Sequence, residues 1–433
     1  MIFFYSHKIT PRLTYIVKQL FYEFLNIKVS FTTNKEEFIE SDKIKINYSN
    51  ANFNSGLFFQ SNSLLFENGI SDVSLIFSTY KNKPCFFSVG ESSSMNFDVF
   101  AASFYLLSRY EEYLPHKRDI YERFSATESI AYKKDFLQEP LIDFWVIELY
   151  NILKKKYPEL PNRERKYSFI NTIDIDNAYA YLNKGLIRTI GGYSKSLLEL
   201  DFKGLKQRSN VLLSREKDPY DTYDFLKEIQ QRYNLNTIYF FLLADYGFND
   251  KNISPFNKNF KNLIKDISDY ADTGIHPSFN SNDIIDILEI EKNRLEDITK
   301  QETNKSRQHF LKINLPKTYQ NLVELDIKED YSMGYADQIG FRASSSNPFY
   351  FYNLDTETQT QLKIIPFCVM EATLKYYLKL TPIQALDQTK SIIEKVKNVN
   401  GSFVSLWHNE TLSNQGVWTG WKMVYESMIK HAI

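Results

Sequence analysis

Three residues whose side chains suit metal or proton chemistry stand at the ends of apolar stretches: Asp174, His276 and His408. Each stretch has the composition of a buried strand, and α/β folds gather their active sites at the carboxyl ends of strands. Carboxylates and imidazoles delivered together to such an edge are typical of a metal-dependent hydrolase. The pattern therefore predicts hydrolytic chemistry around a divalent metal ion.

The first stretch ends in Thr172-Ile-Asp-Ile-Asp-Asn177, which carries two carboxylates on alternate residues. Side chains two positions apart on a strand face the same side, so both acids can address one metal ion or one water. Two like charges so close need a cation or raised pKa values, and both situations are common in active sites. The alternative is a turn or helix N-cap after the strand, in which these side chains bind only backbone.

The other two stretches each end in a histidine. In Gly274-Ile-His-Pro-Ser-Phe279, the proline has no N–H and ends the strand, which leaves His276 at a loop edge. In Ser402-Phe-Val-Ser-Leu-Trp-His-Asn409, His408 follows a buried strand and suits proton donation to a leaving group near neutral pH. The simpler alternatives are a hydrogen-bonded structural His276 and a His408 that only caps a packed Trp407.

Composition sets the class of protein. With 433 residues the chain is long enough for two domains, and its net charge of −1 gives no global attraction to nucleic acid or an anionic membrane. The only cysteines, Cys85 and Cys368, lie in different halves, which argues against disulfides and thiolate metal sites. The first residues lack a secretory-signal pattern and the apolar runs are too short to span a bilayer, so we expect a cytoplasmic protein.

The elements that position these residues fall into two expected domains, divided by a polar, proline-containing stretch at 154–166. Residues 1–160 are expected to form a smaller α+β domain, with strands at 44–48, 56–59 and 73–77 and helices at 98–112 and 141–153. Residues 165–433 alternate strands with helices, which favours a parallel sheet or barrel. Their expected strands lie at 169–173, 237–243, 309–313, 363–369 and 403–406, and their helices at 256–270, 283–298, 318–325 and 383–396.

Taken in order, Thr172-Ile-Asp-Ile-Asp, Gly274-Ile-His-Pro-Ser and Leu406-Trp-His resemble the motifs of polysaccharide deacetylases, the NodB-homology group or carbohydrate esterase family 4. Thr237-Ile-Tyr-Phe-Phe-Leu is similar to that family's second strand, and Gly340-Phe-Arg-Ala-Ser to its Phe-Arg-Ala-Pro stretch. Ser108-Arg-Tyr-Glu-Glu-Tyr is similar to an accessory domain that precedes some of these enzymes. The resemblance covers residues from about 165 to 433.

The resemblance implies a distorted, TIM-like (β/α) barrel of about seven strands that holds a divalent metal ion, usually zinc. It implies Asp174 as the catalytic base, Asp176 and His276 as metal ligands, and His408 as the general acid that protonates the departing amine. The metal ion would polarise the acetamide carbonyl and lower the pKa of the attacking water.

The chain departs from the family in its ligands. Members usually place a second histidine ligand four residues after the first, but that position here is Asn280, and Ile175 separates the two acids. The substitute we expect is His309, in Ser306-Arg-Gln-His-Phe310 at the start of the next predicted strand. Asp176, His276 and His309 would then form a three-ligand catalytic zinc set. Without His309, the metal ion would be held weakly or be absent.

Several further residues are candidates for supporting roles. We expect Arg307 to orient the base, and Arg342 and Trp407 to contact the substrate, although either arginine could form only a surface ion pair. The adjacent Glu111 and Glu112 point different ways on a helix and are expected to be structural. The carboxylate that orients His408 remains open among three residues: Asp326, Asp330 and Asp337.

The function that these features favour is removal of N-acetyl groups from an amino-sugar-containing polysaccharide or glycan precursor. The expected partner is therefore an amino-sugar glycan and not nucleic acid; the oligomeric state is open. Asn280 at the usual ligand position motivates one alternative, a catalytically impaired carbohydrate-binding or scaffold protein on the same fold. Another alternative is a hydrolase that cleaves C–N bonds in small cyclic amides.

Overall fold

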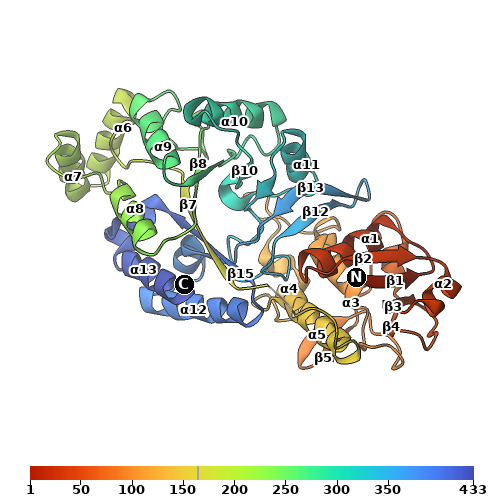
Figure 1. Ribbon diagram of the computed structural model, residues 1–433. Coiled ribbons are helices and arrows are strands. Elements are labelled where there is room, and N and C mark those ends of the chain that lie inside the picture. The colour runs from red at the N-terminus through yellow and green to blue at the C-terminus, as the bar shows by residue number, and fades with distance from the viewer. Residues whose placement is uncertain (163–164) are drawn as a thin grey trace.

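The computed structural model describes residues 1–162 and 165–433; residues 163 and 164, within the predicted boundary stretch, lie outside the described residues. The described chain is a mixed α/β structure with sheets of four, nine and two strands. Figure 1 shows the four-stranded sheet, at the amino-terminal end of the chain, beside the larger sheet that carries most of the remaining elements.

The small sheet has the order β2-β1-β3-β4 and its paired neighbours are parallel. An α+β arrangement was expected here, but parallel strands alternate with helices. A two-stranded antiparallel ribbon, β5-β6, accompanies the small sheet. The strands of this part are β1 (Ile2–Ser6), β2 (Val29–Thr32), β3 (Ile44–Ser49), β4 (Leu57–Gln60), β5 (Phe77–Tyr80) and β6 (Lys83–Phe86).

The large sheet contains nine strands, and each neighbouring pair is parallel except β12–β13. Parallel strands need crossover connections, and helices supply most of them. In sheet order the strands are β12 (Phe349–Asn353), β13 (Thr358–Ile364), β11 (Glu329–Asp330), β10 (Lys305–Ser306), β9 (Asp272–Ile275), β8 (Thr237–Phe241), β7 (Ser168–Ile175), β15 (Ser402–His408) and β14 (Val369–Met370).

Thirteen α-helices accompany the sheets in the described residues. None of these helices is both long and apolar enough to cross a membrane. The helices are α1 (Pro11–Lys18), α2 (Lys35–Glu40), α3 (Val99–Leu107), α4 (Ile130–Lys133), α5 (Leu141–Lys156), α6 (Gly185–Leu198), α7 (Phe202–Leu212), α8 (Tyr223–Arg232), α9 (Lys258–Ser268), α10 (Ile285–Thr299), α11 (Lys317–Glu324), α12 (Pro382–Asn398) and α13 (Trp421–Ala432).

The centre of the large sheet is tightly packed around β9. A Cβ on Gly274 would lie 2.6 Å from the Phe240 ring and 2.9 Å from the Lys305 carbonyl oxygen, so only glycine fits there. Apolar side chains from β8, β15 and the segment before β14 form one buried cluster, which includes Phe240, Leu406 and Phe367. This packing holds β9 in place, and with it His276, the first residue after the strand.

Several expected elements differ from the structure. Residues 309–313 do not form a strand: β10 ends at Ser306, and His309–Leu311 is a single 3-10 turn. Residues 73–76 are not in a strand, because β5 begins at Phe77. The expected strand at 363–369 is two strands, β13 and β14, and the large sheet has nine strands instead of about seven. In the described residues its edge strands are β12 and β14, and no pairing closes them into a barrel.

Buried ion pairs and hydrogen bonds join the amino-terminal part of the chain to the segment that precedes β12. The carboxylate of Glu112 accepts from Arg109 Nε at 2.8 Å and from Arg342 Nε and Nη2 at 2.9 and 2.6 Å. Asp143, on α5, accepts hydrogen bonds from the turn at 345–347, including one of 2.8 Å from the Ser346 backbone N–H. The expectation that Glu112 is structural agrees with this geometry, and the amino-terminal part holds the segment that precedes β12.

We predict that Glu112→Ala destabilises the chain by about 3–5 kcal/mol, because it removes the carboxylate partner of buried Arg342 and leaves Arg109 with Glu111 alone. Urea unfolding followed by circular dichroism measures the change. Glu40→Ala, at an exposed position, is the matched control and should change the free energy of unfolding by less than about 0.5 kcal/mol. Equal stability of the two variants would contradict the structural role of Glu112.

Candidate metal centre

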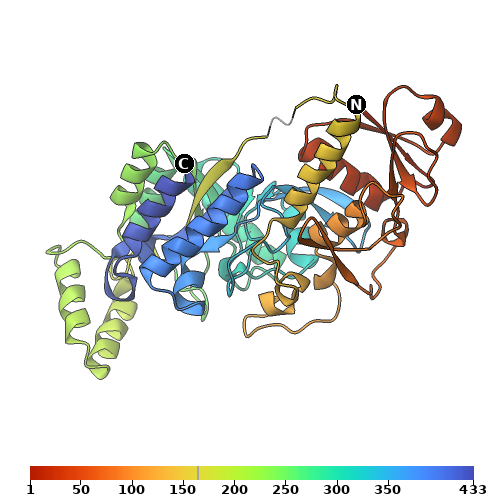
Figure 2. The same ribbon diagram turned by 90° about the horizontal axis from the view of Figure 1, so that it is seen from below.

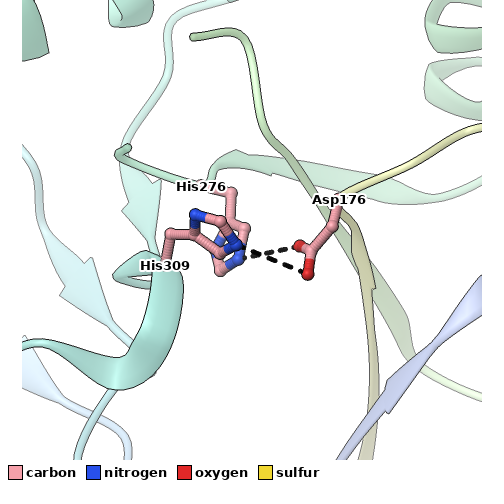
Figure 3. Close-up of side chains that lie close together, drawn as sticks. All are labelled: Asp176, His276 and His309. Atoms are coloured by element: carbon pink, nitrogen blue, oxygen red, sulfur yellow. Dashed lines mark ion pairs between the residues drawn. The ribbon is translucent and has the colours of Figure 1, made fainter. Parts of the chain in front are cut away.

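Three potential ligands converge from three strands of the large sheet, of which β9 and β10 are neighbours and β7 is separated from β9 by β8. Asp176 follows β7, His276 follows β9, and His309 lies in the turn after β10. The Nε2 atom of His276 is 3.2 Å from Asp176 Oδ1, and that of His309 is 3.5 Å from Asp176 Oδ2. Figure 3 shows both imidazoles pointing at the carboxylate. One ligand atom from each residue lies within 4.8 Å of the other two, which is close enough for a single ion.

Each imidazole is held through its other nitrogen. His276 Nδ1 donates to the Arg307 carbonyl at 2.5 Å, and His309 Nδ1 is 2.7 Å from Asp250 Oδ1. A ring whose Nδ1–H is donated in this way presents the Nε2 lone pair, which is the form that binds metals. These partners therefore select the ligating tautomer of both histidines.

His408, the last residue of β15, is a third histidine that faces Asp176. Its Nδ1 lies 2.6 Å from Glu371 Oε1, and its backbone N–H donates to the same oxygen at 3.1 Å. Its Nε2 is 3.8 Å from Asp176 Oδ2, so the ring faces the centre from the side opposite β9. Glu371 follows β14 directly and was not among the carboxylates considered for orienting His408.

Arg307 holds Asp174, the first acid of the motif. Its Nη1 donates to Asp174 Oδ1 at 2.9 Å and to Thr172 Oγ1 at 2.7 Å, and its side chain is fully buried. The other Asp174 oxygen, Oδ2, lies 3.9 Å from His276 Nε2. Asp174 is thus beside the ligand cluster, and its buried charge is balanced by Arg307.

The charges of the centre shift the pKa values of its members. Burial disfavours ionised Asp176, but His309, His276 and His408 outweigh burial and hold its pKa well below the ordinary value. Burial also opposes a proton on His309, yet Asp176 and Asp250 raise its pKa to about 9. For His408, Glu371 and Asp176 overcome the same effect of burial and raise the pKa well above its usual range.

The donor set fits a divalent cation such as zinc. Two imidazole nitrogens and one carboxylate form a usual three-ligand catalytic zinc set, with a fourth position left for water. The Asp176 Oδ1 atom is buried and accepts no hydrogen bond, although a buried carboxylate oxygen normally has a partner. A cation bound between Asp176, His276 and His309 would give this atom its missing partner.

The centre lies in a pocket of about 220 Å³. Its apolar lining includes Leu406, Met370 and Ala336, and the rings of Tyr376 and Tyr377 stand at its edge. The amino-terminal part also reaches the pocket through one residue. Arg123 donates to the Phe310 carbonyl at 2.9 Å and to the Tyr377 hydroxyl at 3.1 Å, so it ties the turn that carries His309 to the aromatic edge.

Two expected substrate contacts do not reach the pocket. Arg342 is fully buried against Glu112, and Trp407 is buried against Trp421 and Tyr425. Strand alternation explains Trp407, because consecutive residues of β15 point to opposite faces and His408 takes the face of the site. Neither Arg342 nor Trp407 is retained as a substrate contact.

Two further expectations concern the usual second ligand position and the carboxylate that orients His408. Asn280 is exposed, so the usual second ligand position does not point into the centre. The carboxylates of Asp330 and Asp337 are bonded to serines, and Asp326 pairs with Lys328, so none of them holds His408.

Sequence reasoning missed three residues of the site: Asp250, Glu371 and Arg123. Glu371 had a usable signal, since a carboxylate just after an apolar strand was the criterion that selected Asp174. Asp250 and Arg123 had none, because both lie in irregular segments far in sequence from the residues they contact.

Comparison with known proteins gives a family match for one part of the chain. A model described as a family of unknown function (DUF7033) matches residues 2–158, the part that contains the small sheet. No curated protein matches the sequence.

Solved structures similar to the chain include several from bacteria. A protein named as a polysaccharide deacetylase from Mycobacterium smegmatis is 12% identical, with a TM-score of 0.39, covering 61% of this chain and 85% of its own. A polysaccharide deacetylase from Bacillus cereus is 11% identical, with a TM-score of 0.30 and coverages of 61% and 86%. A CE4-family pseudoenzyme from Bacillus anthracis is 11% identical, with a TM-score of 0.31 and coverages of 61% and 61%. At such TM-scores, function has to be inferred from the site itself.

We predict that the purified chain binds about one zinc ion, and that His276→Ala and His309→Ala each abolish binding, because each removes a ligand. Elemental analysis of protein dialysed against zinc measures the occupancy. His431→Ala, at the far end of α13, is the control and should retain the metal ion. Full occupancy in both site variants would contradict the assigned ligand set.

We also predict that Asp250→Asn lowers zinc affinity by about 10–100-fold, because Asp250 fixes the ring of His309 without touching the ion. Competition with a chromogenic chelator measures the affinity. Asp245→Asn, in the same loop with an exposed side chain, should leave the affinity unchanged. An unchanged affinity in Asp250→Asn would remove Asp250 from the positioning of His309.

Proposed function

We propose that the chain is a metal-dependent hydrolase that removes N-acetyl groups from an amino-sugar-containing glycan. One observation carries the proposal: the Nε2 atoms of His276, His309 and His408 all face Asp176, beside an Asp174 that is paired with Arg307. This arrangement combines a metal-ligand set, a candidate base and a candidate acid in one pocket. The ordered motifs of the sequence, which resemble those of polysaccharide deacetylases, support the same activity.

The chain's own residues account for the proton transfers of amide hydrolysis. Asp174, hydrogen-bonded to Arg307, would take a proton from the attacking water. His408, held by Glu371, would give a proton to the nitrogen as the C–N bond breaks, so that the products are acetate and a free amine. When bound by Asp176, His276 and His309, the metal ion supplies the Lewis acidity that polarises the acetamide carbonyl.

The pocket suits an acetamido sugar. Leu406, Met370 and Ala336 offer an apolar lining for the acetyl methyl group. Tyr376 and Tyr377 are partly exposed at the edge, where aromatic rings can stack against a sugar. This lining supports an acetylated sugar unit, although a small cyclic amide would use the same metal and acid–base groups.

We further propose the division into an amino-terminal domain over residues 1–160 and a catalytic domain over residues 165–433, in which the large sheet is an open form of the distorted barrel. The separate sheets support the division, and the apolar cluster enclosed by β8, β15 and the segment before β14 supports the curvature. Arg123 at the pocket would make the amino-terminal domain part of substrate selection.

We predict that the zinc-loaded chain releases acetate from an N-acetylglucosamine oligomer, and that Asp174→Asn and His408→Ala each lower kcat by about 10²–10⁴-fold. Both variants should keep their zinc, since neither residue is among the assigned ligands. Lys300→Ala, at an exposed position outside the pocket, is the control for activity.

Two results would contradict this function. Full activity in either variant would show that the base or acid is assigned wrongly. A zinc-loaded wild-type chain that binds the oligomer without releasing acetate would favour a catalytically impaired glycan-binding protein.

A further inference from the structure

Helices α6 and α7 form a hairpin whose apolar side chains point outward. The exposed fractions on α6 are 76% for Leu186, 87% for Ile187, 56% for Ile190, 58% for Leu197 and 85% for Leu198. With about 100° between successive residues, these five positions fall on one face of the helix. A surface helix normally turns such a face toward a core, so this one has no partner within the described chain.

The inner face of the hairpin is polar and already filled. The Arg208 guanidinium of α7 lies 4.8 Å from the centre of the Tyr181 ring and 5.5 Å from that of Tyr193. The Tyr193 hydroxyl lies 2.9 Å from Ser209 Oγ. A Cβ on Gly192 would come within 2.4 Å of the Arg208 guanidinium. Because these contacts occupy the inner face, the outer apolar face cannot be buried by rotating α6 about its axis without breaking them.

The apolar surface continues around the hairpin, which carries a net positive charge. Leu200 in the turn, Phe202 at the start of α7 and Leu213 at its end are 70%, 66% and 61% exposed. Residues 184–212 contain six basic and two acidic residues, a net charge of +4, although the whole chain carries −1. A basic helix with an exposed Leu/Ile/Phe face is the pattern that lies in the interface of anionic membranes.

The hairpin is anchored to the body on its inner side. Arg188 donates to the carbonyls of Lys251 and Asn252 at 2.7 and 2.8 Å, and Asn259 Nδ2 donates to Asn183 at 2.8 Å. The carboxylate of Asp218 accepts from the backbone N–H groups of residues 180–182 at the hairpin's base. Figure 2 shows the two helices projecting from the body, at the end opposite the small sheet.

We propose that the α6–α7 hairpin docks onto an anionic phospholipid surface, with its apolar face in the headgroup region and its exposed lysines, Lys195, Lys203 and Lys206, near the phosphates. Charge favours this occupant over a second copy of the chain. A two-fold dimer would place the same patch against itself and bring two hairpins of +4 together. The proposal does not depend on the metal centre or on deacetylase activity.

Flotation of the full-length chain with vesicles tests the docking. We expect binding to phosphatidylcholine vesicles that contain phosphatidylglycerol, weaker binding to phosphatidylcholine alone, and loss of binding as salt is raised. The double variant Ile187→Ser/Leu198→Ser should bind at least about tenfold more weakly, because it removes two large apolar side chains from the interface. Both positions are exposed, and an unchanged thermal unfolding curve checks that the variant folds.

The matched control is Ile76→Ser/Ile120→Ser, at positions that are 76% and 89% exposed in the amino-terminal part. This variant should bind the vesicles as the wild type does. Wild-type binding that is absent, that persists in the hairpin variant, or that is lost equally in the control would overturn the proposal. So would a concentration-dependent dimer that the hairpin variant abolishes, since the apolar face would then be an interface between two copies.

Discussion

The centre depends on one buried cation, Arg307. Its guanidinium neutralises Asp174 and also bonds to Thr172 and to the Tyr331 carbonyl, while its own backbone carbonyl accepts from His276. One residue on the segment after β10 thereby fixes the acid of β7 and the imidazole after β9. Removing one partner of such a buried pair leaves an uncompensated charge, which is far costlier than losing an exposed ion pair. The positions of Asp174 and His276 are therefore coupled through Arg307.

The candidate site holds more carboxylates than permanent positive charges. Four carboxylates, those of Asp174, Asp176, Asp250 and Glu371, face the histidines, and Arg307 is the only permanent positive charge that contacts any of these carboxylates in the described residues. The raised pKa values of His309 and His408 express the same excess of negative charge. Protons on imidazoles can supply part of the balance, and a divalent ion beside Asp176 can supply the rest.

The amino-terminal part supports the site from outside the large sheet. Glu112 neutralises Arg342, which precedes β12, and Arg123 bonds the carbonyl of Phe310 next to His309. Phe310 has φ of 59°, a left-handed conformation that is unfavourable for a bulky residue and needs support from its surroundings. The candidate ligand His309 thus lies on a strained turn that Arg123 of the amino-terminal part contacts.

The sequence by itself determined the local features. Apolar strands ending in Asp174, Asp176, His276 and His408 were visible because strand periodicity and strand ends are properties of neighbouring residues. The helices α9 to α12 were predictable for the same reason. Tertiary structure decided the rest. Glu371, Asp250 and Arg123 join the site through contacts between residues that are distant in the chain. Trp407 and Arg342 do not reach the site, because both side chains are buried in packed regions elsewhere. The outward face of α6 was equally hidden, since a helical pattern shows that a face is apolar but not whether anything covers it.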